Sequence, residues 1–288
     1  MLHSNIQPNR NKMSYSRKDF IKTIGLGAIG ASSLSFKSNG KATLAEHKLT
    51  VGLASYTLRK YSLDEVIEIC QRLDIKDVAF KSFHLPYESS NEELLQITAK
   101  VKARGLNLYG CGVIYMKTPE DVEKYFNYAK AAGLNMIIGA PEHHLLDIIE
   151  AKVKQTDIKL AIHNHGPEDE IFPSPGSVYE KIKNLDKRIG LCVDTGHTFR
   201  LNLDPATELK KYKDRLFDVH IKDINEQIPK GQNVEIGRGK MNIPSIMKAL
   251  KEIEYNGVLG LEYEKDGDHA IYGLSESVGY VRGVLKMV

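Results

Sequence analysis

The chain has 288 residues, 42% apolar and 27% charged, and a net charge of +3 from 40 basic and 37 acidic side chains. This length suits one α/β barrel of about 250 residues, and the near balance of charge counts against a dedicated nucleic-acid-binding surface. The three cysteines, Cys70, Cys111 and Cys192, show no CxxC spacing. We therefore expect small buried apolar side chains rather than disulfides or a cysteine zinc site.

Residues 1–45 differ in character from the rest. Arg17, Lys18 and Lys22 precede a Gly- and Ala-rich run over residues 23–35, and a basic segment followed by a short apolar one is typical of an export signal. The stretch SRKDFIK resembles a twin-arginine signal with Lys18 in place of the second arginine. We predict a signal peptide and export to the periplasm, or a cytoplasmic protein if the signal is not functional. A helix of the fold itself is the alternative.

After residue 46, strand-like and helix-like segments alternate eight times. The apolar strand patterns cover residues 49–56, 77–83, 106–114, 134–139, 158–163, 189–194, 216–222 and 257–263. Segments with apolar spacing near 3.6 lie between them, and Ser62, Asn91 and Thr118 stand where N-caps belong. We find no hairpin signal, so the strands are expected to be parallel. Eight such units predict a single (β/α)8 TIM barrel over residues 46–288, with an open doubly wound sheet as the alternative.

Polar side chains gather at the ends of the last four strands. Residues two apart on a strand share a face. By this rule the inward-facing polar side chains are His163 and His165 on the fifth strand, Asp194 on the sixth, His220 and Lys222 on the seventh, and Glu262 and Glu264 on the eighth. Barrel enzymes carry their chemistry at this end, and buried charges are costly unless paired or coordinated. The pattern predicts a divalent metal site for Mn, Mg, Co or Zn. Taken singly, each residue has a plainer alternative: a hydrogen-bonded histidine, a turn-capping Asp194, or a Glu262–Lys222 ion pair.

Residues 48–286 resemble the xylose isomerase-like barrels, which include sugar isomerases and epimerases, hydroxypyruvate isomerase and endonuclease-four-type enzymes. The resemblance rests on Asp194 in VDTGH, His220 in DVHIKD and Glu262 in GLEYE. It implies that these three residues bind the metal. It also implies that His197, which follows the sixth strand, contacts the substrate as a catalytic residue.

The fifth strand departs from the pattern of this family. Many relatives read ENHG there, whereas this chain reads HNHG over residues 163–166. His163 falls on the ligand position and completes the predicted metal set, and His165 is expected to face the substrate. In the epimerase relatives that glutamate is one of two bases on opposite faces of the reacting carbon. Its replacement leaves Glu262 as the predicted general base, and a second base would have to be Asp169, Glu168 or Lys222.

Further substrate contacts are predicted in loops after the second and seventh strands. Lys81 and His84 in FKSFHLP are expected to bind sugar hydroxyls, and Arg238 in EIGRGK is expected to clamp a substrate oxygen. The EIGRGK loop lacks the GxxxxGK spacing of a nucleotide-binding loop. A packing role for the first two residues and a tight turn for the loop are the alternatives.

Together these features predict a metal-dependent isomerase or epimerase acting on a keto- or aldo-sugar. The metal would polarise a carbonyl and stabilise an enediolate, while Glu262 takes the α-proton and Lys222 or a histidine returns one. A 3-keto-glycoside lyase using the same first step is one alternative, and a non-catalytic sugar-binding barrel is the alternative from another class. We expect a small-molecule carbohydrate as partner, no nucleic acid and no stable membrane span. The resemblance implies a homodimer.

Overall fold

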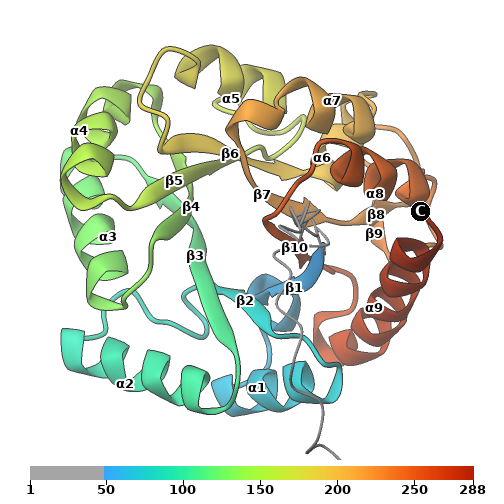
Figure 1. Cartoon of the computed structure of the whole chain (residues 1–288), viewed down its shortest axis with the longest axis horizontal. Coiled ribbons are helices and arrows are strands. Elements are labelled where there is room, and N and C mark those ends of the chain that lie inside the picture. Colours follow the sequence, from blue (N-terminus) through green and yellow to red (C-terminus); the bar gives the residue numbers. More distant parts are fainter. Residues whose placement is uncertain (1–48) are drawn as a thin grey trace, which may run out of the picture. The chain divides into compact units, whose positions relative to one another are not determined.

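The computed structural model describes residues 49–288, so the predicted signal peptide lies outside the described residues. The barrel strands are β1 (Thr50–Ala54), β2 (Asp77–Phe80), β3 (Asn107–Met116), β4 (Met136–Pro141), β5 (Lys159–His163), β6 (Ile189–Asp194), β7 (Leu216–Ile221) and β10 (Val258–Leu261). They form a closed barrel in the order β1-β10-β7-β6-β5-β4-β3-β2 (Figure 1). All neighbours are parallel, and β1 pairs with both β10 and β2, which closes the ring. The predicted barrel is confirmed and the open sheet is wrong.

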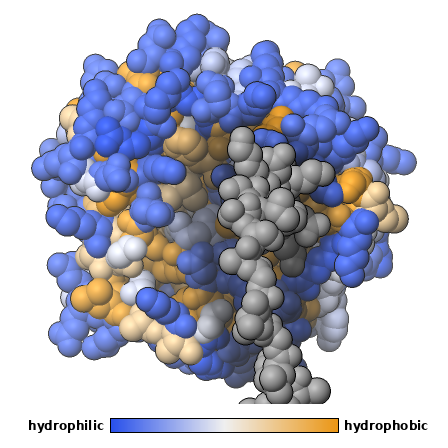
Figure 2. Space-filling model, viewed as in Figure 1, coloured by the Kyte–Doolittle hydropathy of each residue, from blue (hydrophilic) through white to orange (hydrophobic). Residues whose placement is uncertain are grey.

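Helices follow the strands and surround the barrel (Figure 1). They are α1 (Leu63–Arg72), α2 (Asn91–Ala103), α3 (Pro119–Ala131), α4 (Leu146–Thr156), α5 (Pro175–Ile182), α6 (Thr195–Arg200), α7 (Pro205–Lys211), α8 (Ile243–Glu252) and α9 (Ala270–Met287). In Figure 2 their outer faces are mostly hydrophilic. Within residues 49–288, none of these helices has the length and apolar character needed to cross a membrane.

Capping residues explain where the first helices begin. Ser62 and Thr118 cap α1 and α3 as predicted, each in a reciprocal capping box. The prediction for α2 is wrong by one residue, because Ser90 is the cap and Asn91 is already helical. Ser90 is favoured because the carboxylate of Glu93, three residues later, accepts a hydrogen bond of 2.7 Å from its backbone N–H.

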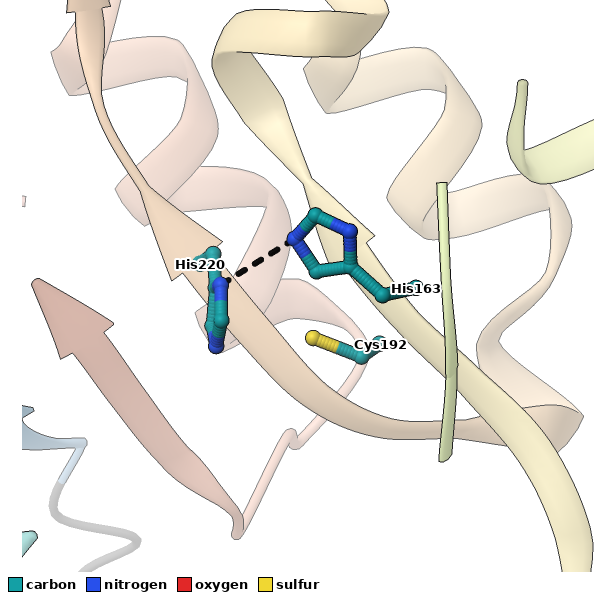
Figure 3. Close-up of side chains that lie close together, drawn as sticks. All are labelled: His163, Cys192 and His220. Atoms are coloured by element: carbon teal, nitrogen blue, oxygen red, sulfur yellow. Dashed lines mark hydrogen bonds between the residues drawn. The ribbon is translucent and has the colours of Figure 1, made fainter. Parts of the chain in front are cut away.

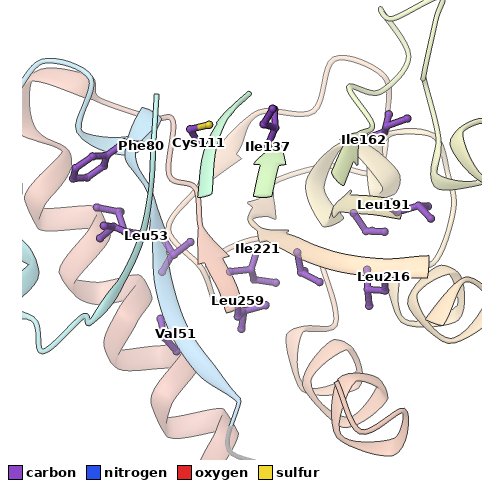
Figure 4. Close-up of a cluster of buried hydrophobic side chains, with 14 of the residues drawn as sticks. Val51, Leu53, Phe80, Cys111, Ile137, Ile162, Leu191, Leu216, Ile221 and Leu259 are labelled. Carbon is purple, nitrogen blue, oxygen red and sulfur yellow. The ribbon is translucent and has the colours of Figure 1, made fainter. Parts of the chain in front are cut away.

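Two apolar regions fill the fold. The larger lies between strands and helices, and Figure 4 shows its strand side chains, among them Leu53, Phe80, Ile137 and Ile221. A smaller cluster fills the barrel interior with Ala79, Val113, Met136, Ile138, Ala161 and Cys192. All three cysteines are buried and free, as expected. Because Ile221 packs toward the helices, its neighbours His220 and Lys222 turn into the barrel.

The loop after β7 contains a small second sheet that the sequence analysis did not expect. Strands β8 (Asp223–Ile224) and β9 (Asn233–Val234) pair antiparallel there. The prediction that the chain contains no hairpin is therefore wrong for this loop. Strands of this length are too short to show an alternating pattern, and the Asn225 side chain helps to hold the pair by accepting a hydrogen bond of 2.8 Å from Gln232 N.

Candidate active site

Four buried ligand-type side chains meet at the C-terminal ends of β5, β6, β7 and β10. His163 Nε2 lies 3.1 Å from His220 Nδ1 and 3.4 Å from Asp194 Oδ2, and His220 Nδ1 lies 3.1 Å from Glu262 Oε2. Figure 3 shows the two imidazoles facing each other above Cys192. One donor atom from each of the four residues lies within 4.8 Å of the others. We call these four residues the metal cluster.

The spacing of the metal cluster fits a small divalent cation. Ligand atoms arranged as a tetrahedron about 2.1 Å from a cation are about 3.4 Å from one another, close to the distances observed here. In the described part of the chain His163 Nδ1 and His220 Nε2 are buried without a hydrogen bond. Each histidine thus turns one nitrogen toward the centre of the cluster and keeps the other behind it.

The protonation states of His163, Asp194 and Glu262 suit metal binding, whereas the carboxylates around His220, Glu262 foremost, raise the pKa of that ring against the effect of burial. Burial, assisted by the neighbouring His165, holds the pKa of His163 well below its ordinary value, so its ring is neutral. Burial alone would raise the pKa of Asp194 and Glu262, but the charge of Lys222 and contacts with the neighbouring histidines together hold both values well below the usual range. Neutral imidazole and ionised carboxylate are the forms that coordinate cations.

Lys222 lies directly beside the metal cluster. Its Nζ is buried and lies 3.0 Å from both Asp194 Oδ2 and Glu262 Oε2, and it also pairs with Glu264. Burial lowers the pKa of Lys222, but these three carboxylates raise it well above its ordinary value. The ion pair considered as a plainer alternative for Glu262 is therefore present, and it coexists with the contacts of Glu262 to the histidine.

Asp194 serves two purposes because its two oxygens point in different directions. Oδ1 accepts a hydrogen bond of 2.7 Å from His197 N and so caps α6, while Oδ2 faces His163. Asn164 fixes this arrangement, since its Oδ1 accepts a hydrogen bond of 2.9 Å from Asp194 N. Sequence reasoning missed Asn164. The available signal in the sequence was its place between two predicted site histidines.

Asp218 is a second residue that sequence reasoning left without a role. It is fully buried beneath the cluster, and its Oδ2 lies 3.6 Å from His220 Nε2, the nitrogen that faces away from the cluster centre. Tyr109 donates a hydrogen bond of 3.4 Å to Oδ1, and the Cys192 thiol donates one of 3.5 Å to Oδ2. A carboxylate behind a ligating histidine orients the ring and increases its basicity.

We expect Asp218→Asn to weaken binding of a divalent cation by about 10- to 100-fold, because His220 would lose its orienting carboxylate. A competition titration against a chelator measures this change. Cys192→Ala is the matched control: burial and the charge of Asp218 raise the pKa of the Cys192 thiol well above its ordinary value, so it is not a thiolate ligand. Equal affinities in the two variants would contradict the assigned role of Asp218.

The predicted substrate-facing histidines lie at the mouth of the barrel. The His165 ring centroid is 4.4 Å from that of His163, and the His197 centroid is 5.9 Å from it. Tyr115 Oη lies 3.0 Å from His165 Nε2. Gly166 adopts a φ of +87°, and a Cβ there would lie 3.1 Å from His197 Nδ1, so glycine lets the HNHG turn pass close to the second histidine.

The other predicted substrate residues are not gathered at the metal cluster. His84 is only 2% exposed, and its Nε2 lies 3.0 Å from the Tyr61 carbonyl oxygen. Arg238 is exposed and pairs with Glu276 of α9. Lys81 lies at the mouth, with Nζ 5.2 Å from the ring centroid of Tyr56.

The three residues predicted as a possible second base, Asp169, Glu168 and Lys222, lie in different places. Glu168 pairs with Arg200 on the surface, and Asp169 Oδ1 accepts hydrogen bonds of 2.7 and 2.9 Å from Ile171 N and Phe172 N. Of the three candidates for a second base, the structure brings Lys222 alone into direct contact with the metal cluster.

A polar cavity of about 610 Å³ opens beside Lys222. Its lining comes from α6, from the β8–β9 hairpin after β7 and from the segment after β10, and it includes His197, Arg200, Asn225, Gln232, Asn233 and Glu264. The nearby glycine-rich loop offers no free amides to a phosphate, because Gly237 N and Gly239 N donate hydrogen bonds of 2.8 and 3.0 Å to Asp223. The loop therefore does not form a phosphate-binding set of amides, and the polar side chains of the cavity suit a hydroxylated molecule.

Curated relatives and solved structures share this architecture. Inosose dehydratase from Clostridium perfringens is 27% identical over 144 residues, which make up 42% of this chain and 46% of that protein. The chain thus spans about half the length of the curated relatives it matches. An uncharacterised protein from Parabacteroides distasonis is 26% identical with a TM-score of 0.64, over 82% of this chain and 98% of that one.

The IolI protein, solved with a bound zinc atom, has a TM-score of 0.71 at 14% identity, over 83% of this chain and 99% of that one. At this identity the likeness concerns the fold. A model of the family described as xylose isomerase-like TIM barrel matches residues 117–284, more than half of the sequence and the part that carries the whole metal cluster. The chain belongs to the xylose isomerase-like TIM barrel family.

Proposed function

We propose that the protein is a divalent-metal-dependent enzyme that enolises a keto- or aldo-sugar, in the manner of sugar isomerases and epimerases. The observation that carries this proposal is the buried metal cluster, whose four donor atoms lie within 4.8 Å of one another at the catalytic end of the barrel. The polar cavity beside Lys222 supports a hydroxylated substrate. The zinc atom in the IolI structure supports a metal of this kind.

In this proposal a divalent cation held by the cluster supplies Lewis acidity that makes the proton beside a carbonyl more acidic. Glu262 is ionised and buried, and it takes that α-proton as general base. Lys222 is protonated and lies 3.0 Å from Glu262 Oε2, so it can deliver a proton at the same place. His165 and His197 orient the sugar at the mouth.

A β-elimination is the second candidate, and His163 favours it. Two-base epimerisation needs a second carboxylate beside the reacting carbon, whereas His163 is a neutral imidazole and Asp169 is held by backbone amides. Elimination needs one base: Glu262 accepts the α-proton, a C=C bond forms, and the β-carbon–oxygen bond breaks. The leaving oxygen departs with the electron pair and takes a proton from Lys222. The inosose dehydratase relatives support this class of step.

The test uses the full chain, stripped with a chelator and reconstituted with Mn, Mg, Co or Zn. Proton NMR in ²H₂O follows a 3-keto-glucoside and free ketohexoses. We expect deuterium to enter an α-carbon of at least one sugar with a metal bound, and not without it. Release of the C1 substituent would identify elimination, and a rearranged sugar would identify isomerisation or epimerisation. No exchange with any of the four metals would contradict the proposed function.

A further inference from the structure

Three aromatic side chains stand at the barrel mouth beyond β1, β2 and β3. Tyr56 follows β1, Phe83 follows β2, and Tyr115 lies near the end of β3. Phe83 and Tyr115 are 49% and 50% exposed, and the ring centroids of Tyr56 and Phe83 are 6.1 Å apart. We call these three residues the aromatic shelf. Grouped exposed apolar surface in this place is typical of a binding site.

Lys81 lies between two members of the aromatic shelf. Its Nζ is 5.2 Å from the ring centroid of Tyr56 and 5.8 Å from that of Tyr115. Within residues 49–288 the Lys81 ammonium contacts these two ring faces and makes no ion pair or hydrogen bond. Since a partly buried ammonium without an acceptor is unfavourable, this group is suited to an oxygen of a bound molecule.

The aromatic shelf reaches the metal cluster through His165. The Tyr115 and His165 rings stack with centroids 5.4 Å apart and an interplanar angle of 28°, and the His165 centroid is 4.4 Å from that of His163. Burial lowers the pKa of Lys81 and raises that of Tyr115, and the charge of Glu262 raises both values. The polar cavity, in contrast, is lined by α6, the β8–β9 hairpin and the segment after β10. The mouth therefore has a polar side and an aromatic side, with the metal cluster between them.

From this division we infer that the substrate is a glycoside whose C1 substituent is a ring, and that this ring stacks on the aromatic shelf while Lys81 binds one of its oxygens. The inference rests on the proposed function, which places the sugar itself at the metal cluster. A monosaccharide held there would leave the Phe83 and Tyr115 rings exposed and Lys81 without an acceptor. Aromatic rings favour offset or edge contacts with a second flat ring, which a methyl substituent does not offer.

The test compares binding of phenyl β-glucoside and methyl β-glucoside to the metal-reconstituted full chain by titration calorimetry. Neither compound carries a keto group, so neither is turned over. We expect the phenyl compound to bind about fivefold more tightly or better. Tyr115→Ala and Phe83→Ala should each reduce its affinity by about fivefold and leave the methyl compound within about twofold.

Two controls separate ring stacking from other effects. Tyr115→Phe keeps the ring and loses the hydroxyl that contacts His165, so it should retain the preference for the phenyl compound. Tyr272→Ala removes an aromatic that is 76% exposed on α9 and should change neither affinity. Equal or absent binding of the two compounds would overturn the inference, whereas metal-dependent deuterium exchange on free ketohexoses would still support the proposed function.

Discussion

Glutamine in place of Glu262 is expected to lower the rate of α-proton exchange by about 10²- to 10⁴-fold at saturating metal. The amide keeps an oxygen directed at the cluster but cannot accept the proton. In the native protein the carboxylate is ionised, since Lys222 and His220 hold its pKa well below the usual range against the effect of burial. The measurement is deuterium incorporation by NMR, with metal content determined on the same sample.

The comparison with Asp194→Asn separates loss of the base from loss of the metal. Asp194 also faces His163, but its other oxygen caps α6, so it is not free to act as a base. We expect Asp194→Asn to recover exchange as metal concentration rises, and Glu262→Gln not to recover. A Glu262→Gln protein that exchanges at the native rate would show that another residue takes the proton.

Lys222→Met is expected to have the largest effect on stability. Without metal it would leave Asp194 and Glu262 as buried carboxylates lacking their common cation, together with the partly exposed Glu264. Removing one partner of a buried ion pair destabilises a protein by about 3–5 kcal/mol. Urea unfolding of the metal-free protein measures this loss. Saturating divalent metal should reduce the deficit, because the cation binds the native state and restores positive charge.

The matched control is Lys100→Met, which removes a half-exposed lysine of α2 paired with the exposed Asp64 of α1. Exposed ion pairs contribute about 0–1 kcal/mol, so its unfolding free energy should change little. If the metal-free Lys222→Met protein were as stable as the native one, Lys222 would not be the charge that balances the cluster.

The sequence was sufficient to predict the barrel and to select the four residues that the structure brings together. Strand alternation is strict, so VDTGH, DVHIKD and GLEYE directed Asp194, His220 and Glu262 to one interior. The same rule turned both His163 and His165 inward on β5, and the resemblance to relatives that read ENHG there singled out His163 as the fourth ligand. This succeeded because strand residues inherit their direction from a two-residue period, and parallel strands place their ends at one edge of the barrel.

Loop residues were harder to place, because no period fixes a loop side chain. His84 packs inward against Phe80 and Arg238 turns to Glu276, although both were expected to contact substrate. Asp218 and Asn164 act through partners on other strands or helices, and such contacts are not visible in a linear pattern. Tyr115 belongs to the mouth because β3 runs on to Met116, beyond its predicted end at residue 114.

The central claim is that His163, Asp194, His220 and Glu262 hold a metal ion, and metal content tests it most directly. The full chain would be stripped, reconstituted and analysed by elemental analysis after removal of free ion, beside His163→Ala and the control His144→Ala. We predict one divalent ion per chain in the native protein and in the control, and loss of that ion in His163→Ala. A native protein that retains none of the four metals, or a His163→Ala protein that retains one as tightly, would contradict the account.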